Sequence, residues 1–511
     1  MTTPEHLSNI HYTNLDYSKG NILYHTPFVG REREIAILQN EWESVQARIL
    51  ILYGRRRVGK TRLVTHWINS VTPRALYWVA EPTSSVDQLR SFSQALFGFE
   101  SNSPVPEDFS YGSWAQAFEQ AARMAKHERF ALVLDEFTYL IALEQGIAGI
   151  LQNAWDHQLK SSNIFLIISG SHLGMMERSV LSYQAPLYGR ATAKLHLQPL
   201  PFKATKGMFP NYKADERVAL YAIFGGVPAY WEQFDPNLSL DRNIKQHLLG
   251  DANLNEDEPR LLLQDFVTDI HNYASILRAI AYGYRTPKEI ASAAGLNERH
   301  ISMYLSNLLQ TGFVERRVPV TQTSASRQGR HHITDPFLRF HYRFLSRRQA
   351  QLALGVRDQA LAEIKKHLID FIGTHTWEEL CREWLLRASG KSLLPFLPDQ
   401  VGSIWNREAQ IDVAGVNFMD KTLILGECKW DRHPKDIGTL EKLIDKTDKV
   451  LPKDGRWKVF YLGFARSGWT SNAIKFAKID AKKAQGKRWQ SVGMLLRNLD
   501  QIDDELAAWT G

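Results

Sequence analysis

Gly54-Arg55-Arg56-Arg57-Val58-Gly59-Lys60-Thr61 is the stretch that decides the fold of this chain. It follows the pattern of a glycine, four residues and Gly-Lys-Ser/Thr, in which backbone N–H groups can close around an anion. The apolar run at 49–53 predicts a buried strand before it, and residues 62–68 predict a helix after it. This strand, loop and helix together predict a site for the phosphates of a nucleotide.

Each residue of the loop from Gly54 to Thr61 is a candidate nucleotide contact. We expect Lys60 to reach the β- and γ-phosphates and the Thr61 hydroxyl to take a Mg²⁺ position. The alternative is a glycine turn that carries a surface lysine. ATP and Mg²⁺ are therefore the expected cofactors.

Bulk composition describes an ordinary globular protein of 511 residues, 44% hydrophobic and 23% charged, which predicts about three domains. No apolar run approaches the roughly 20 residues that cross a bilayer, so we expect no membrane partner. Residues 1–21 are polar and lack the apolar centre of a signal peptide. Two cysteines, Cys381 and Cys428, cannot build a disulfide framework, which predicts a cytoplasmic protein.

Four more short apolar runs resemble the strand at 49–53, and helical stretches separate them; they lie at 76–79, 130–134, 164–168 and 194–197. This alternation predicts a parallel sheet covered on both faces. Ligands of such sheets bind at the carboxyl ends of the strands, where Lys60, Asp135 and Ser169 are expected.

Asp135 and Glu136 follow a predicted strand about 75 residues after the phosphate loop. We expect Asp135 to hold Mg²⁺ through water, and Glu136 to orient and deprotonate the attacking water. The alternative is a solvated strand end. Ser169 or Ser171 could sense the γ-phosphate, or form a plain turn. Arg190 is the candidate cation for transition-state charge, on its own subunit or a neighbour, against the alternative of an exposed structural arginine.

Gly225-Gly226-Val227-Pro228 interrupts a helical stretch that begins near Glu216. Glycine and proline break a helix and let backbone approach a ligand, which suits a lid that brings Pro228 against the nucleotide. A loop between two helices is an equally good interpretation.

Five of these motifs together resemble the prokaryotic ATPases related to AAA+ and STAND proteins: residues 28–32, 54–61, 134–137, 186–190 and 225–228. The resemblance implies a P-loop NTPase parallel sheet with a helical lid, a winged helix-turn-helix, and in many members a C-terminal restriction-endonuclease-like α/β domain. It therefore implies a multidomain α/β protein that uses ATP.

Residues 287–294, a turn at Gly295 and a second helix capped by Asn297 predict a helix-turn-helix, which a strand from 312 and a polar loop at 319–332 complete as a winged helix. Its second helix offers few groups for reading bases, Arg299 and His300 among them. The loop region is richer, and we expect four arginines there to grip phosphates: Arg316, Arg317, Arg327 and Arg330. The alternative is a winged helix that serves only for packing. Residues 335–344 predict a buried helix.

The C-terminal region predicts two adjacent strands, at 408–413 and 423–430. Side chains alternate along a strand, so Glu427 and Lys429 share a face that Asp412 can meet. Asp412 and Glu427 would bind Mg²⁺, and Lys429 would position hydroxide or steady charge. One of three glutamates on a preceding helix could complete the site: Glu378, Glu379 or Glu383.

Asp412, Glu427 and Lys429 resemble the acid and acid-x-lysine pattern of the PD-(D/E)xK nuclease superfamily. The alternatives are a solvated strand, or a domain that binds without cleaving. Residues 429–488 carry 16 Lys and Arg against 7 Asp and Glu, an excess larger than the +7 of the whole chain, which favours DNA as a partner. We expect some of four tryptophans to stack on bases: Trp430, Trp457, Trp469 and Trp489.

The resulting prediction has five parts: an N-terminal tail (1–24), a P-loop ATPase core (25–200), a helical lid (201–265), a winged helix (266–350) and a nuclease-like domain (351–511). It describes an ATPase that acts on DNA through a Mg²⁺-dependent domain controlled by nucleotide state. The main alternative is an ATP-driven switch whose C-terminal domain binds DNA or protein without cleaving, and a DNA-binding regulator is a third. Assembly into a homo-oligomer is left open.

Overall fold

The computed structural model describes residues 10–12, 26–101, 105–250, 258–264 and 269–509. The chain forms two compact units. The first is Met1–Leu200 with Val227–Glu232, and the second is Pro201–Gly226 with Gln233–Gly511. The predicted domain boundaries at 265 and 350 fall within the second unit and remain predictions.

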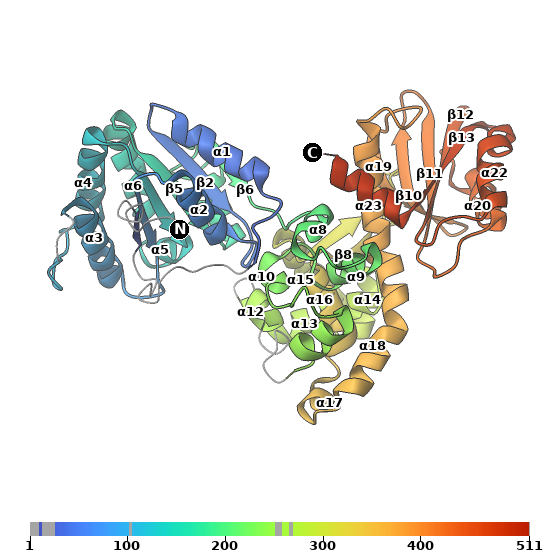
Figure 1. Ribbon diagram of the computed structural model, residues 1–511, viewed down its shortest axis with the longest axis horizontal. Helices are drawn as coiled ribbons and strands as arrows, with labels where there is room; N and C mark the ends of the chain where they lie inside the picture. Colours follow the sequence, from blue (N-terminus) through green and yellow to red (C-terminus); the bar gives the residue numbers. More distant parts are fainter. Residues whose placement is uncertain (1–9, 13–25, 102–104, 251–257, 265–268, 510–511) are drawn as a thin grey trace. The chain divides into compact units, whose positions relative to one another are not determined.

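A parallel sheet forms the centre of the first unit, with the strand order β1-β3-β4-β5-β2-β6 (Figure 1). Its strands are β1 (Ile10–Tyr12), β2 (Arg48–Tyr53), β3 (Ala75–Val79), β4 (Ala131–Asp135), β5 (Phe165–Gly170) and β6 (Ala193–His196). The five predicted strands are confirmed. The polar tail is corrected in one respect, because β1 pairs with β3 and adds an edge strand; its residues 1–9 and 13–24 lie outside the described part.

Helices cover both faces of this sheet. Alternate side chains along the strands belong to two separate apolar clusters, and each cluster includes residues from helices. Ile49 and Ile51 pack with the helices Ser85–Ser101 and Trp114–His127, whereas Leu50 and Leu52 pack with the helices Glu32–Glu43 and Lys60–Val71. The helices are α1 (Glu32–Glu43), α2 (Lys60–Val71), α3 (Ser85–Ser101), α4 (Trp114–His127), α5 (Phe137–Leu143), α6 (Ile147–His157), α7 (Leu173–Met176) and α10 (Pro228–Trp231), with the short turns η2 (Leu159–Ser161) and η3 (Glu177–Leu181). The unit has the P-loop NTPase fold.

Short helices begin the second unit: η4 (Phe202–Ala204), α8 (Thr205–Met208), α9 (Ala214–Phe224), α11 (Leu240–Asn243), η5 (Ile244–Leu248) and α12 (Glu258–Gln264). Glycine is required directly after α9, since Gly225 has a φ of 58° and a Cβ there would lie 2.9 Å from Pro336 Cγ. An acidic stretch at 251–259, which the sequence also suggests as a domain boundary, lies mostly outside the described residues.

Three helices and a two-stranded antiparallel sheet follow, around one apolar cluster: α13 (Ile270–Ala281), α14 (Pro287–Ala294), α15 (Glu298–Gln310), β7 (Val314–Arg317) and β8 (Arg330–Ile333). The predicted caps are confirmed, since Gly295 ends α14 with a φ of 69° and the Asn297 side chain caps α15. The predicted buried helix is α16 (Pro336–Phe340) with the π-helix η6 (His341–Leu345). Its apolar residues are buried, whereas Arg343 is partly exposed.

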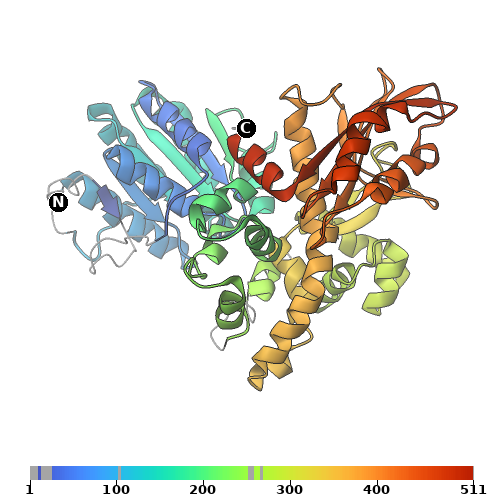
Figure 2. The same cartoon turned by 45° about the vertical axis from the view of Figure 1, so that its right-hand side comes forward.

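A mixed five-stranded sheet forms a separate C-terminal domain, in the order β13-β12-β11-β10-β9. The long helix α18 (Arg357–Ile372) leads into this domain (Figure 2). Its strands are β9 (Gln400–Trp405), β10 (Gln410–Asn417), β11 (Thr422–Lys429), β12 (Trp457–Ala465) and β13 (Trp489–Asn498). The helices of this part are α17 (Gln349–Ala353), α18 (Arg357–Ile372), η7 (Gly373–Trp377), α19 (Glu378–Ser389), α20 (Ile437–Asp445), α21 (Thr447–Val450), α22 (Ser471–Ile479), η8 (Ala481–Lys483) and α23 (Leu499–Ala508). None of the helices in the described ranges is long and apolar enough to cross a membrane.

The loop between β7 and β8 packs on the edge strand β9 of this sheet. Val320 N–H donates to the Ser403 carbonyl at 3.0 Å, and Trp405 Nε1 donates to the Gln328 carbonyl at 3.0 Å. The Val320 side chain belongs to the apolar cluster of the C-terminal sheet. The loop therefore covers an open sheet edge, which removes unpaired backbone groups from solvent.

Candidate functional site

The phosphate loop holds Lys60 inside its own curve. Gly59 has a φ of 93°, a conformation that favours glycine, and Lys60 begins α2 directly after it. The Lys60 ammonium donates to the carbonyls of Gly54 at 3.0 Å and Arg55 at 3.3 Å. Burial lowers the pKa of Lys60, while the carboxylates of Glu136 and Asp135 oppose that shift. A buried ammonium held by carbonyls at the start of a helix is arranged to receive an anion.

Asp135 accepts two hydroxyl hydrogen bonds on one oxygen. Thr61 Oγ1 donates to Asp135 Oδ2 at 2.7 Å, and Tyr77 OH donates to the same atom at 2.5 Å. Burial and the Asp135 carboxylate hold the pKa of Tyr77 well above its usual value, so the tyrosine remains a donor. Sequence reasoning missed Tyr77; the only signal was a hydroxyl in the middle of an apolar strand.

Glu136 has a backbone φ of 51°, in the left-handed region that is unfavourable for a glutamate. Its Oε2 accepts a hydrogen bond from Ser171 Oγ at 2.6 Å. Ser169 Oγ, two residues before Ser171 and within β5, is buried without a hydrogen-bond partner in the described part of the chain. Of the two predicted serines, Ser171 therefore meets the predicted acid at the carboxyl ends of β4 and β5.

Arg31, from the motif at residues 28–32, contacts the backbone of the phosphate loop. Its guanidinium donates to the carbonyls of Val58 at 3.0 Å and Gln198 at 2.7 Å, and pairs with Glu34 at 3.1 Å. The arginine is buried and so fixes the loop backbone. The sequence offered no periodic signal for this contact, because its partners are main-chain atoms.

The segment Val227–Glu232 lies against the phosphate loop within the first unit. A Cβ added at Gly59 would lie 3.7 Å from Pro228 Cγ, and the Arg57 guanidinium is 5.9 Å from the centroid of the Tyr230 ring. Glu232 forms an ion pair with Arg62 of α2. Pro228 is thus beside the predicted nucleotide contacts.

Arg190 lies in a bidentate contact with Asp156 of α6, with its Nε and one terminal nitrogen 2.9 and 2.7 Å from the two carboxylate oxygens. It also donates to the carbonyls of Pro186 and Tyr188. The side chain is partly exposed. In this arrangement Arg190 is a structural arginine, and its role toward a phosphate remains a prediction.

In the C-terminal domain, β10 and β11 are adjacent strands as predicted, and they pair antiparallel with Val413 opposite Gly426. Glu427 is buried between two ammonium groups: Lys429 Nζ lies 2.7 Å from its Oε1, and Lys446 Nζ lies 2.7 Å from its Oε2. The shared face of Glu427 and Lys429 is therefore confirmed. Lys446, between α20 and α21, was not among the predicted site residues.

Asp412 lies beside this pair, and its Oδ2 accepts the Cys428 N–H at 3.0 Å. Burial and the nearby Glu427 carboxylate raise the pKa of Asp412. Within the described part of the chain, no three His, Cys, Asp or Glu side chains are grouped closely enough to hold one metal ion. Lys429 and Lys446 neutralise the Glu427 carboxylate.

Of the three candidate glutamates on α19, Glu378 is the one next to Asp412. One terminal nitrogen of Arg382 lies 3.4 Å from Glu378 Oε2 and 3.1 Å from the Asp412 carbonyl. Burial and the Asp412 carboxylate raise the pKa of Glu378 to about 8. Glu379 instead pairs with Arg317 and Arg339, and Glu383 pairs with Arg387.

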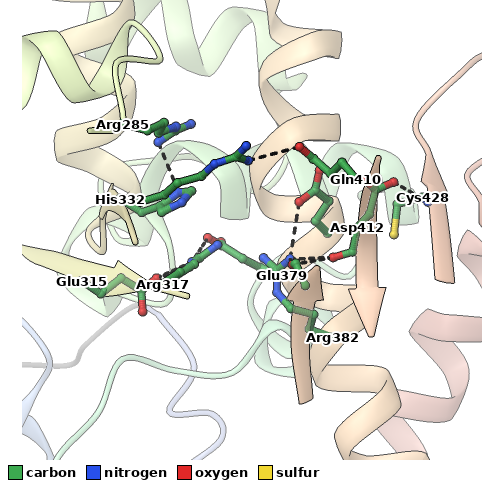
Figure 3. A network of polar contacts seen from close by, with 12 residues as sticks. Arg285, Glu315, Arg317, His332, Glu379, Arg382, Gln410, Asp412 and Cys428 are labelled. Atoms are coloured by element: carbon green, nitrogen blue, oxygen red, sulfur yellow. Dashed lines mark hydrogen bonds and ion pairs between the residues drawn. The ribbon is translucent and has the colours of Figure 1, made fainter. Parts of the chain in front are cut away.

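A network of arginines joins the β7–β8 hairpin to this domain (Figure 3). Arg317 pairs with Glu379 at 3.0 Å, and Arg330 donates to Gln410 at 3.2 Å and lies 4.7 Å from the Trp405 ring centroid. Arg316 donates to two carbonyls of its own loop. The expectation that the loop arginines grip phosphates is wrong for Arg317 and Arg330, which are used inside the protein; Arg316 and Arg327 are exposed, and their contact with phosphates remains a prediction.

Three of the four tryptophans expected to stack on bases are core residues: Trp430, Trp457 and Trp489. Trp469 is only partly exposed, and its Nε1 donates to the Arg497 carbonyl at 3.3 Å. The base-stacking expectation is wrong for the three buried rings, which pack in the interior of the domain.

Comparison with known proteins gives two domain matches. Residues 28–234 match an ATPase domain predominantly from Archaea, and residues 341–440 match a domain of archaeal and bacterial proteins of unknown function. The uncharacterized protein MJECL04 of Methanocaldococcus jannaschii is 30% identical over 437 residues, which are 85% of this chain and 94% of that protein.

Two solved structures also align with the chain. The Walker-type ATPase PABY2304 of Pyrococcus abyssi is 18% identical, covers 62% of this chain and 96% of its own, and has a TM-score of 0.46. The Orc1 protein of Aeropyrum pernix, solved in complex with DNA, is 15% identical, covers 66% and 95%, and has a TM-score of 0.31.

Proposed function

This chain belongs to the family that joins an archaeal-type ATPase domain to a C-terminal domain of unknown function, and we propose that it hydrolyses ATP to control an action on DNA. The C-terminal domain is nuclease-like in this proposal. The observation that carries the ATPase part is the phosphate loop, with Lys60 inside it and Thr61 hydrogen-bonded to Asp135.

The residues present fit ATP and Mg²⁺. Backbone N–H groups and Lys60 would hold the phosphates, while Thr61 and Asp135 offer the oxygen ligands that Mg²⁺ prefers. Mg²⁺ bound there would neutralise charge on the phosphates. Glu136 then orients water and accepts its proton, and Tyr77 keeps Asp135 in place. The Ser171 hydrogen bond restrains Glu136 until the nucleotide is seated.

Nucleotide state would be transmitted through the segment Val227–Glu232. It lies against the phosphate loop, and Gly225 and Gly226 connect it to α9 of the second unit. α9 is tied to the C-terminal domain by a buried pair, with Arg217 2.6 Å from Asp503, and by Arg466 with Asp215. A change at the loop would therefore act on a helix that the C-terminal domain holds.

The nuclease-like reading is supported by Asp412, Glu427 and Lys429 on two paired strands, with Glu378 beside them. A Mg²⁺ ion held by Asp412 and Glu427 would take the place of the Lys446 ammonium, which is already a cation at that carboxylate. When bound, Mg²⁺ would activate water for phosphodiester hydrolysis. The basic stretch 429–488 and a winged helix formed by α13–α15 with β7 and β8 support DNA as the partner.

A second candidate function is a switch that binds DNA or protein without cutting. One observation favours it: both oxygens of Glu427 are taken by lysines. A carboxylate neutralised in this way has lower affinity for a metal ion, because the ion must displace an ammonium.

The test is a plasmid assay with Mg²⁺ or Mn²⁺, with and without ATP, on the wild type, Lys60→Ala and Glu427→Ala. The proposal expects nicking that depends on the metal, responds to ATP and disappears in Glu427→Ala. Nucleotide-dependent binding without nicking, unchanged in Glu427→Ala, would favour the switch. Absence of both nicking and binding would contradict an action on DNA.

Two further parts of the proposal concern its setting. Cys381 and Cys428 are both free thiols, which supports a reducing cytoplasm. Arg190 could serve a neighbouring copy if its pair with Asp156 opened, which makes a homo-oligomer part of the proposal. Sedimentation with and without ATP would test this.

A further inference from the structure

Two arginines lie on one tyrosine ring in the second unit. Arg343, in η6, has its guanidinium carbon 4.7 Å from the centroid of the Tyr282 ring, and the carbon of Arg347 is 4.5 Å from the same centroid. Tyr282 ends α13, and η6 packs along that helix through Tyr342, which shares an apolar cluster with Ile276. The ring therefore gathers two cations at one place.

A third arginine belongs to this group. Arg278 is one helical turn before Tyr282, on the same face of α13, and its Nε is buried without a hydrogen-bond partner in the described residues. Burial and the nearby Arg278 charge lower the pKa of His341 in η6 to about 4, whereas burial raises the pKa of Tyr342 to about 12 against the opposing effect of Arg278. We call Arg278, Arg343 and Arg347 around Tyr282 the arginine surface.

No carboxylate of the described chain forms an ion pair with these three arginines, in contrast to Arg317, Arg339 and Arg217. The two segments that build the surface, 270–288 and 336–356, contain seven Lys and Arg residues and no Asp or Glu, although Asp269, Glu289 and Asp335 directly adjoin them and Arg339 is paired with Glu379. Cations held together without acids repel one another, and an anion that binds them relieves that repulsion. A chain of phosphates is the polyanion that arginines bind most specifically.

We propose that the arginine surface binds the phosphate backbone of single-stranded DNA. This rests on the proposed action on DNA and gives it a location. Tyr284, two residues beyond Tyr282, is 46% exposed, and an exposed aromatic ring beside a basic surface can stack on an unpaired base. Duplex DNA presents no free base face to such a ring. Arg317 and Arg330 of the β7–β8 hairpin are already committed to partners in the C-terminal domain, whereas the three arginines of this surface have no ion pair in the described residues.

The test is fluorescence anisotropy of a labelled single-stranded oligonucleotide with the full chain, at several salt concentrations. Arg343→Gln/Arg347→Gln is compared with the wild type and with Arg123→Gln/Lys126→Gln, which removes two exposed cations from α4 of the first unit. Loss of two phosphate contacts lowers the slope of log affinity against log salt by about 1.4. We expect affinity near 0.1 M salt to fall at least about tenfold, with the control pair unchanged.

Folding is monitored in the same samples by thermal unfolding. Tyr282→Leu, which leaves the arginines without their ring, should also weaken binding, and Arg347→Gln alone should lower the slope by about half as much as the double variant. Arg347 is exposed, so its substitution does not disturb the core.

Each other outcome overturns the inference in a different way. If the wild type binds and the double variant binds equally well, DNA is held elsewhere, and the proposed function survives. If duplex DNA binds more tightly than the single strand, the strand type is wrong. If polyglutamate displaces the oligonucleotide as well as unlabelled DNA does, the surface is for an acidic protein. If the wild type binds no DNA, the proposed function falls together with this inference.

Discussion

The two candidate sites use the same groups, carboxylates and lysines, in opposite arrangements. In the phosphate loop, Lys60 rests on backbone carbonyls, and Asp135 is held by the hydroxyls of Thr61 and Tyr77. In the C-terminal domain, two lysines rest directly on Glu427. The first arrangement keeps a positive and a negative group separate, so it can receive a phosphate and a metal ion. The second is already neutral and must exchange one cation for another.

The largest effect should come from Glu136→Gln. The variant keeps the size and hydrogen bond of the side chain but cannot accept a proton, so we expect ATP hydrolysis to fall roughly 10²–10⁴-fold. ATP binding should be unchanged. Phosphate release and nucleotide binding are measured together, with the exposed Glu128→Gln as the control. Hydrolysis at the wild-type rate would show that Glu136 does not accept the proton of the attacking water.

Glu379→Ala tests the ion pairs beside the C-terminal site. It leaves Arg339, which is 3% exposed, buried without its carboxylate. We expect the free energy of unfolding of the second unit to fall by about 2–3 kcal/mol. Glu383→Ala is a matched control, since Glu383 lies on the same helix, is equally exposed and forms only a pair with Arg387 four residues on; its cost should be within about 0.5 kcal/mol. Urea unfolding followed by tryptophan fluorescence checks both, and equal costs would contradict the network.

The pH dependence of stability tests the crowding of acids at the C-terminal site. Burial and Asp412 raise the pKa of Glu378 to about 8, above the ordinary 4.5. The folded protein then retains a proton that the unfolded chain has lost, so this group makes stability fall as pH rises from about 4.5 to about 8. In Glu378→Gln, measured with EDTA, we expect equality with the wild type at pH 5 and a gain of about 1–2 kcal/mol at pH 8.5. If the stability of Glu378→Gln differed from that of the wild type by the same amount at both pH values, folded Glu378 would not retain the extra proton.

The smallest effect concerns the exchange of cations at Glu427. Lys446→Ala removes the ammonium from Glu427 Oε2, so Mn²⁺ affinity in the absence of nucleotide should rise about three- to tenfold, as expected for removal of one competing charge at a partly exposed site. Calorimetric titration measures it. Lys442→Ala, an exposed lysine one turn earlier, should leave Mn²⁺ affinity as in the wild type. A loss of affinity in Lys446→Ala would show that the lysine supports the metal site.

The sequence predicted features that arise from local pattern. Three features follow from short-range periodicity or turn chemistry: the five predicted strands of the first unit, the caps at Gly295 and Asn297, and the shared face of Glu427 and Lys429. What it did not predict depends on tertiary contacts. Tyr77 contacts Asp135, and Lys446 contacts Glu427, from segments distant in the sequence. Arg317 and Arg330 of the hairpin looked exposed because their partners lie on α19 and β10.

The most direct test of the central claim is calorimetric titration of ATP with Mg²⁺ into the wild type, Lys60→Ala and Glu427→Ala. We expect saturable binding by the wild type and by Glu427→Ala, and at least about a hundredfold weaker binding by Lys60→Ala, because a buried ammonium is lost from the phosphates. Equal affinity of the wild type and Lys60→Ala, or no binding by the wild type, would contradict the account.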